Sequence, residues 1–287
     1  MSRNKDRIGG THSPDTDVPP NLHDEGQDGG GFSFVVPTEF VELPSKGAFY
    51  PPNHPLHNCD SIEIKQMTAK EEDILTSKTL LKKGVALERV ISSIIVDKRI
   101  RASALLTGDR NALIIAARVS AYGNMYETKV ACPACAETQE YQFDLNETHF
   151  KTTMVDSGIE VTNNNDGTFT TELPRTKLLV TFRLMTGVDE KQLTDGVEAD
   201  RKTRNQHERG VSRMLRGIMV AVNGNETAEA INYTVENIPS IDARHLRLSF
   251  KQVNPDIDMQ QHFECQACGH EGQMEVPLTA DFFWPDR

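Results

Sequence analysis

Two short cysteine pairs, far apart in the chain, restrict the possible fold more than any other sequence feature. The first pair is Cys132 and Cys135, and the second is Cys265 and Cys268. Both CxxC pairs have an apolar residue two positions before the first cysteine, and apolar residues six, eight and ten positions after the last. These residues are Val130, Tyr141, Phe143 and Leu145 in one copy and Phe263, Met274, Val276 and Leu278 in the other. A tight turn followed by apolar residues at every second position predicts a strand, a knuckle and a second strand.

Four thiols from two such knuckles form the ligand set of a closed tetrahedral zinc site of the ribbon type. We therefore predict that Cys132, Cys135, Cys265 and Cys268 together hold one structural Zn²⁺. Redox pairs, disulfides and incidental cysteines remain alternatives, since a single CPAC motif also suits a thioredoxin-like fold. The segment between the two pairs is also much longer than in a compact zinc ribbon.

The similarity of the two CxxC regions extends upstream. A shift of 133 residues, which carries Cys132 onto Cys265, also carries Asp109 onto Asp242 without a gap. A hydroxyl residue precedes each aspartate, which is typical of a helix start. We interpret the pattern as a duplicated helix, strand, knuckle, strand unit, with chance as the alternative because few other identities support it. The further matched pairs are Thr107 with Ser240, Leu113 with Leu246, Ile115 with Leu248 and Arg118 with Lys251.

The composition limits the classes of function. A chain of 287 residues suffices for one or two domains with a core. Its formal net charge of -11 argues against binding of a nucleic-acid backbone as the main task. No apolar run is long enough to span a bilayer, and the first ten residues lack the apolar core of a signal peptide. We therefore expect a soluble protein made in a reducing cytoplasm, whose cysteines suit metal better than a disulfide framework.

Four regions are predicted along the chain. Residues 1–31 form a disordered acidic, Gly-rich tail, either an inert linker or a segment that orders against a partner. Residues 32–150 form an N-terminal α+β unit with the first knuckle, residues 151–237 an inserted hairpin and long charged helix, and residues 238–287 a C-terminal helix with the second knuckle. The predicted fold class is α+β, with helices, short strands and a zinc-ribbon-like clip built from two distant CxxC knuckles.

Local patterns predict the elements of the first unit. Short strands broken by Pro37 are expected over residues 32–43, and another strand over residues 60–67. Thr68 and Glu71 have the spacing of a capping box, so a helix should run from there toward Gly84 and bury Ile74, Leu75 and Leu80 or Leu81. A second helix is expected over residues 87–95, and a third from near Asp109 to Gly123.

The remaining elements are predicted in the same way. Residues 159–161 and 168–173 flank an Asn-rich turn, which predicts a hairpin, and residues 177–185 predict a further strand. Residues 189–222 indicate a long charged helix, and residues 241–253 the last helix. The terminal aromatic residues Phe282, Phe283 and Trp284 are expected to anchor in the protein's own core or in a neighbour's groove.

No catalytic constellation stands out in the sequence, which lacks GxSxG, GxxxxGK and HExxH motifs. His54, His57 and Cys59 lie close together and suit either a second metal or, as we favour, a surface loop with a partly buried thiol. Arg110 and Arg118 should pair with acidic residues or backbone carbonyls. A four-cysteine site leaves no open coordination position, which disfavours metal catalysis.

Several ordered sequence blocks resemble a known family. They are residues 43–51 (LPSKGAFYP), 67–76 (MTAKEEDILT) and 105–113 (LLTGDRNAL), then Arg118, Tyr122, Gly123, Tyr126 and the CPAC motif at 132–135. Together they are similar to the baseplate hub subunit family of T-even-type contractile-tailed phages, a family of myovirus baseplate structural proteins. The resemblance covers about residues 40–145.

This resemblance implies a structural, non-enzymatic protein at the centre of a virion tail baseplate, present in the host cytoplasm during assembly. Its implied partners are other baseplate hub and tail proteins, including the tape-measure protein. Two other classes of function remain. One is a zinc-ribbon adaptor for nucleic acid or transcription machinery, which the acidic or neutral surroundings of both knuckles disfavour. The other is a thiol oxidoreductase using Cys132 and Cys135, which needs a thiolate of low pKa.

Overall fold

The computed structural model describes residues 35–151, 158–202, 209–277 and 280–283. The predicted tail over residues 1–31 lies outside these ranges, as do Phe32, Phe34, Leu278 and Trp284. The described residues combine helices with small antiparallel sheets, which confirms the α+β fold class. None of the described helices is long and apolar enough to cross a membrane.

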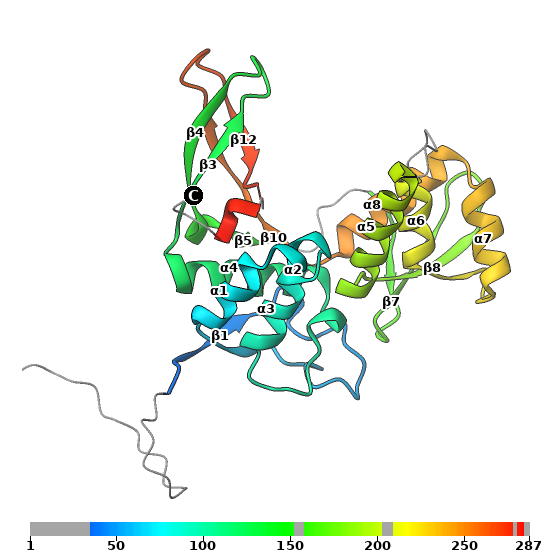
Figure 1. The fold of residues 1–287 in the computed structure, drawn as a ribbon. Coiled ribbons are helices and arrows are strands. Elements are labelled where there is room, and N and C mark those ends of the chain that lie inside the picture. Colours follow the sequence, from blue (N-terminus) through cyan, green and yellow to red (C-terminus); the bar gives the residue numbers. More distant parts are fainter. Residues whose placement is uncertain (1–34, 152–157, 203–208, 278–279, 284–287) are drawn as a thin grey trace, which may run out of the picture. The chain divides into compact units, whose positions relative to one another are not determined.

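The first half of the chain contains a two-stranded sheet, a group of helices and the first CxxC hairpin (Figure 1). Its elements are β1 (Thr38–Glu42), β2 (Ser61–Lys65), α1 (Ala69–Thr76), α2 (Lys78–Lys82), α3 (Ala86–Ile94), the 3-10 turn η1 (Ala102–Ala104), α4 (Thr107–Tyr122), β3 (Met125–Ala131), β4 (Thr138–Asp144), the 3-10 turn η2 (Leu145–Glu147) and β5 (His149–Phe150).

The second half contains a four-stranded sheet in the order β6-β7-β8-β9, further helices and the second CxxC hairpin. Its elements are β6 (Thr162–Asn163), β7 (Thr168–Glu172), β8 (Leu179–Arg183), α5 (Gly187–Lys202), α6 (Gly210–Ile218), β9 (Met219–Val222), α7 (Ala228–Asn237), α8 (Ser240–Val253), β10 (Ile257–Asp258), β11 (Gln260–Glu264), β12 (Glu271–Glu275) and the 3-10 turn η3 (Ala280–Phe283).

Several sequence and structural features recur in the same order in the two halves, beyond the CxxC regions. A Leu-Pro turn follows β1 at Leu43 and follows β7 at Leu173, and both leucines are fully buried. The sequence M-T-x-x-[ED]-E-x-x-L-T begins at Met67 in the first half, where it leads into α1, and at Met185 in the second, where it leads into α5. These matches favour β7, β8 and α5 as counterparts of β1, β2 and α1. The expectation that residues 151–237 are an insertion stays a prediction.

A buried aspartate holds each Leu-Pro turn against the helix that leads to the knuckle. In the first half the Asp109 carboxylate, on α4, accepts hydrogen bonds from the Ser45 amide at 2.9 Å and the Tyr50 hydroxyl at 2.8 Å. In the second half the Asp242 carboxylate, on α8, accepts from the amides of Arg175 at 2.8 Å and Thr176 at 3.0 Å. Both carboxylates are fully buried, so each must be satisfied by the turn it caps.

A carboxylate side chain caps the N-terminus of α1 and that of α5 in the same way. The Glu71 carboxylate accepts from the backbone amide of Thr68 at 2.9 Å, which confirms the predicted capping box. The Asp189 carboxylate accepts from the backbone amide of Thr186 at 2.8 Å. The two helix entries therefore have the same local chemistry, and Asp189 also forms an ion pair with Arg183 at 2.7 Å.

Two predicted helices differ from the structure. The helix expected from Thr68 to Gly84 breaks at Ser77, whose ψ of 104° is extended and separates α1 from α2. Leu81 consequently stays 40% exposed. The single long helix expected over residues 189–222 was wrong in two respects, because α6 begins separately after the non-helical Arg209 (ψ 36°) and residues 219–222 form β9. Pairing of β9 with β8 places Phe182 opposite Met219, and this sheet bonding overrides the helical spacing of the apolar residues.

Two further differences concern local signals. Helix α7 was not predicted, although Thr227 caps it by accepting a hydrogen bond from the Ala230 amide. The strand expected over residues 159–161 lies slightly later, at β6. The strands β1, β2, β7 and β8 and the helices α3, α4 and α8 lie where the sequence placed them, and Gly123 ends α4 as predicted.

Candidate metal centre

The candidate metal centre lies at the tips of two antiparallel hairpins. Strands β3 and β4 pair up to Ala131 opposite Thr138, and strands β11 and β12 pair up to Glu264 opposite Glu271. The CxxC turns connect the strands directly at these ends. The two hairpins, green and red-brown in Figure 1, run side by side. The folded chain thus brings together two turns that are far apart in the sequence.

Both knuckles have the same backbone geometry. The Cys132 amide donates to the carbonyl of Glu137, and the Cys265 amide donates to the carbonyl of His270, each at 2.9 Å. One residue after the last cysteine the backbone is left-handed, with φ of 61° at Ala136 and 68° at Gly269. Such a turn points both sulfurs of a pair to one side, as a shared metal requires.

All four cysteine sulfurs converge on one point. They lie within 4.8 Å of one another, and the Cys132–Cys268 and Cys135–Cys265 sulfur separations are both 3.8 Å. A tetrahedral site with zinc–sulfur bonds of about 2.3 Å needs sulfurs about 3.8 Å apart. The four thiols therefore fit a metal ion, and the sequence prediction that these residues come together is confirmed.

The thiols have strongly different proton affinities. Burial disfavours a charge on Cys132, but the amides of Cys135 and Ala134 donate to its sulfur and lower its pKa to about 6. The His270 amide favours ionisation of Cys268, yet the neighbouring cysteine side chains raise its pKa to about 12. One thiolate makes further thiolates at the same point costly. A bound cation would remove this conflict, because it stabilises all four thiolates together.

Polar and aromatic contacts join the two hairpins below the cysteines. The Gln139 side chain donates to the Glu264 carbonyl at 3.0 Å and accepts from the Gln266 amide at 2.9 Å. The Tyr141 hydroxyl donates to the His262 carbonyl at 2.9 Å, and its ring lies 5.1 Å from that of Phe263. From the sequence, Tyr141 was predicted only as an apolar strand residue, and no contact was predicted for Gln139. These contacts fix the spacing of the turns.

The other predicted site residues lie elsewhere and have structural roles. His57 Nδ1 is 2.7 Å from the Tyr50 carbonyl, and His54 Nδ1 accepts from the Leu56 amide at 3.2 Å. The half-buried Cys59 thiol lies against loop carbonyls. Within the described residues, the four knuckle cysteines form a cluster suited to a metal, and the His54–Cys59 loop does not.

Arg118 ties the C-terminal aromatic residues to α4. Its guanidinium is fully buried and donates to the carbonyls of Phe282 and Gly123, each at 2.7 Å, and to that of Met125 at 3.2 Å. Phe282 and Phe283 are buried in the protein's own core. Of the two locations expected for the aromatic end, Phe282 and Phe283 thus occupy the protein's own core. Of the two kinds of partner expected for Arg118, the structure has backbone carbonyls.

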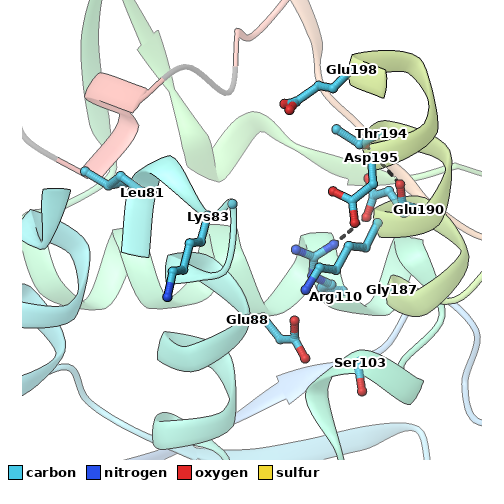
Figure 2. A pocket seen from close by; sticks show the side chains of 12 residues that line it. Leu81, Lys83, Glu88, Ser103, Arg110, Gly187, Glu190, Thr194, Asp195 and Glu198 are labelled. Carbon is cyan, nitrogen blue, oxygen red and sulfur yellow. Dashed lines mark hydrogen bonds and ion pairs between the residues drawn. The ribbon is translucent and has the colours of Figure 1, made fainter. Parts of the chain in front are cut away.

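A groove of about 290 Å³ lies where α5 of the second half approaches the first half (Figure 2). Arg110 reaches into it and forms an ion pair with Glu190. Further carboxylates line it at Glu88, Asp195 and Glu198. The Arg110–Glu190 ion pair makes this groove a charged contact between two parts of the fold.

Comparison with known proteins identifies the family but gives no near relative. No curated protein matches the chain, and no solved structure matches it. The sequence pattern of the family described as T4 bacteriophage base plate protein matches residues 36–284, which include all the elements described above. The chain therefore belongs to the family of T4 bacteriophage base plate proteins.

Proposed function

We propose that this protein is a non-enzymatic structural or assembly component of the central hub region of a phage tail baseplate. Membership of the base plate family supports a structural role in the tail, with other phage tail proteins as partners. Within that setting we propose other hub proteins and the tape-measure protein as its neighbours. The protein would act in the host cytoplasm during assembly and in the baseplate of the virion.

We further propose that one Zn²⁺ bound by the four knuckle cysteines fastens the two halves of the chain together. A single observation carries this proposal. The sulfurs of Cys132 and Cys268, which are 136 residues apart in sequence, lie only 3.8 Å from each other. Zinc is the metal that four thiolates at tetrahedral spacing favour. The site would be structural, because four protein ligands leave no position for water or substrate.

Metal analysis of the purified full chain tests the zinc site. About one zinc per chain is expected, with thiols that do not react with a thiol reagent until a chelator is added. Fully folded protein without metal would overturn the site. Freely reactive thiols that cycle with a disulfide would instead favour an oxidoreductase.

Localisation tests the role in the tail. Labelled protein should be found on tails or on baseplate assembly intermediates, at the central region. Absence from both would count against the proposal. Strong binding to DNA that weakens steeply with salt would favour the nucleic-acid adaptor, although the net charge of -11 opposes it.

A further inference from the structure

The two halves of the chain meet through the segments that enter α4 and α5. The Thr107 amide donates to the Met185 carbonyl at 3.1 Å, and the Gly187 amide donates to the Leu105 carbonyl at 3.0 Å. These bonds form a short antiparallel bridge between Leu106 and Thr186. Leu105, Leu106 and Gly187 are buried there. We name this contact the inner joint, formed by residues 105–107 and 185–187.

The internal repeat supplies a second, equivalent pair of segments. Residues 238–240 enter α8 as residues 105–107 enter α4, and the residues before the two helices have nearly the same backbone angles. Leu106 has φ -59° and ψ 144°, and Pro239 has φ -58° and ψ 146°. Residues 67–69 enter α1 with the same Met-Thr sequence and the same carboxylate cap as residues 185–187 before α5. We name residues 67–69 and 238–240 the open ends.

The open ends have the same backbone amides and carbonyls as the inner joint, but within the described part of the chain these groups are not hydrogen-bonded. Among the described residues, none accepts a hydrogen bond from the amides of Ser240 and Ala69, and none donates one to the carbonyls of Met67 and Ile238. These four groups correspond to the four that bond in the inner joint. Ser240 and Ala69 are exposed, and the neighbouring Ile241 side chain is 58% exposed. Unpaired amides are usual at the start of a helix, so the open ends are distinguished by their equivalence to the inner joint and by their exposure.

We infer that the open ends bind each other between two molecules of this protein. Residues 238–240 of one molecule would lie antiparallel to residues 67–69 of the next, with the Ser240 amide donating to Met67 and the Ala69 amide donating to Ile238. A second copy is the occupant that the repeat specifies, because the chain already makes this contact with itself once. The contact uses different surfaces on the two molecules, so it is head-to-tail and produces a closed ring or an open chain.

Proline at the first position of α1 or of α8 should break the proposed contact without disturbing that helix. Proline has no amide hydrogen but is well tolerated at the first helical position. The preceding residues, Pro239 and Thr68, already have the extended backbone that a following proline requires. Ser240→Pro and Ala69→Pro therefore each remove one intermolecular hydrogen bond. Ala228→Pro is the matched control, because Ala228 is the exposed first residue of α7 and lies outside both open ends.

Sedimentation of the zinc-loaded full chain over the micromolar to low-millimolar range gives the first readout. The wild type and the Ala228→Pro variant should associate beyond a monomer as concentration rises. Ser240→Pro and Ala69→Pro should each shift the association to at least tenfold higher concentration, as expected for the loss of about 1.4 kcal/mol. A wild type that stays monomeric throughout, or association that neither proline alters, would overturn the inference.

Mixing the two proline variants gives the sharper test. Each variant keeps the end that the other lacks, so an equimolar mixture should form one-to-one dimers and stop there. A mixture that behaves like its separate components would rule out a head-to-tail contact. If Ser240→Pro shows a loss of helix by circular dichroism, Ile241→Asp replaces it. This exposed change should weaken association without unfolding α8, and unchanged association would count against the inference.

Discussion

Ala136 and Gly269 occupy the same left-handed position in the two knuckles, and only one of them is a glycine. Left-handed backbone costs a residue with a Cβ atom about 1 kcal/mol relative to glycine. A Cβ added at Gly269 would meet no atom within 4 Å, so the cost there is purely conformational. We expect Gly269→Ala to reduce the free energy of unfolding by about 1 kcal/mol, measured by urea denaturation of the zinc-loaded protein.

The opposite exchange is the matched control. Ala136→Gly should leave stability unchanged or raise it slightly, because glycine relieves the backbone strain that alanine bears in the first knuckle. If Ala136→Gly were the more damaging of the two, the equivalence of the turns would be wrong.

Arg118 is the buried charge whose replacement should matter most. A lysine keeps the charge, but its compact ammonium lacks the planar fork with which the guanidinium reaches the carbonyls of Gly123 and Met125 in one stretch of chain and of Phe282 in another. We expect Arg118→Lys to lower the free energy of unfolding by about 3 kcal/mol, because buried carbonyls lose their donors. In Arg99→Lys, where the side chain is 80% exposed, the change should stay within about 0.5 kcal/mol. Equal effects in the two variants would contradict the assigned role.

At the scale of elements, the two helices that lead to the knuckles respond differently to acid. Burial raises the pKa of Asp109 on α4 above its usual range, although Ser45 and Tyr50 donate to it. Burial acts the same way on Asp242 of α8, but the donors at Arg175 and Thr176 lower its pKa below the usual range. Equivalent carboxylates therefore have pKa shifts of opposite sign.

The sign of each shift sets the pH dependence of stability. Asp242 stabilises the fold above its ordinary pKa of about 3.9, and that contribution is lost as the pH falls through its lowered folded pKa. Ionised Asp109 costs stability, which is regained as the pH falls through its raised folded pKa. Relative to the wild type, Asp242→Asn should therefore lose less stability on acidification, and Asp109→Asn more. Urea denaturation between about pH 6 and pH 3 measures both, and parallel curves would contradict the prediction.

At the scale of the whole molecule, the knuckle cysteines should dominate stability. Cys132→Ser and Cys268→Ser remove one proposed zinc ligand, and metal binding is coupled to folding. We expect either change to lower the Tm by about 6 °C or more, since a loss above about 3 kcal/mol, at about 2 °C per kcal/mol, moves a domain of this size by that amount. Cys59→Ser, in a surface loop, should change the Tm by only about 2 °C. Equal melting temperatures for all three variants would remove the basis for the zinc fastener.

Much of the fold follows from local sequence. The capping box at Thr68, the stop at Gly123 and the alternating apolar residues after each CxxC fixed helices and strands that depend mainly on their own residues. The break at Ser77 and the strand β9 were missed for the same physical reason. Their conformations are set by what they pack and pair against, such as Phe182 of β8 opposite Met219, and a single-sequence pattern does not contain those partners.

The sequence by itself determined the four cysteines, the α+β class and the resemblance to a baseplate family, because residue type, spacing and ordered blocks are local properties of the chain. Only the tertiary structure brought the sulfurs of Cys132 and Cys268 to 3.8 Å, buried Arg118 against the C-terminal carbonyls and bonded the Leu-Pro turns to buried aspartates. It also distinguished the bonded inner joint from the two open ends. Such distinctions depend on which surfaces meet, and that is decided by packing between segments distant in the sequence.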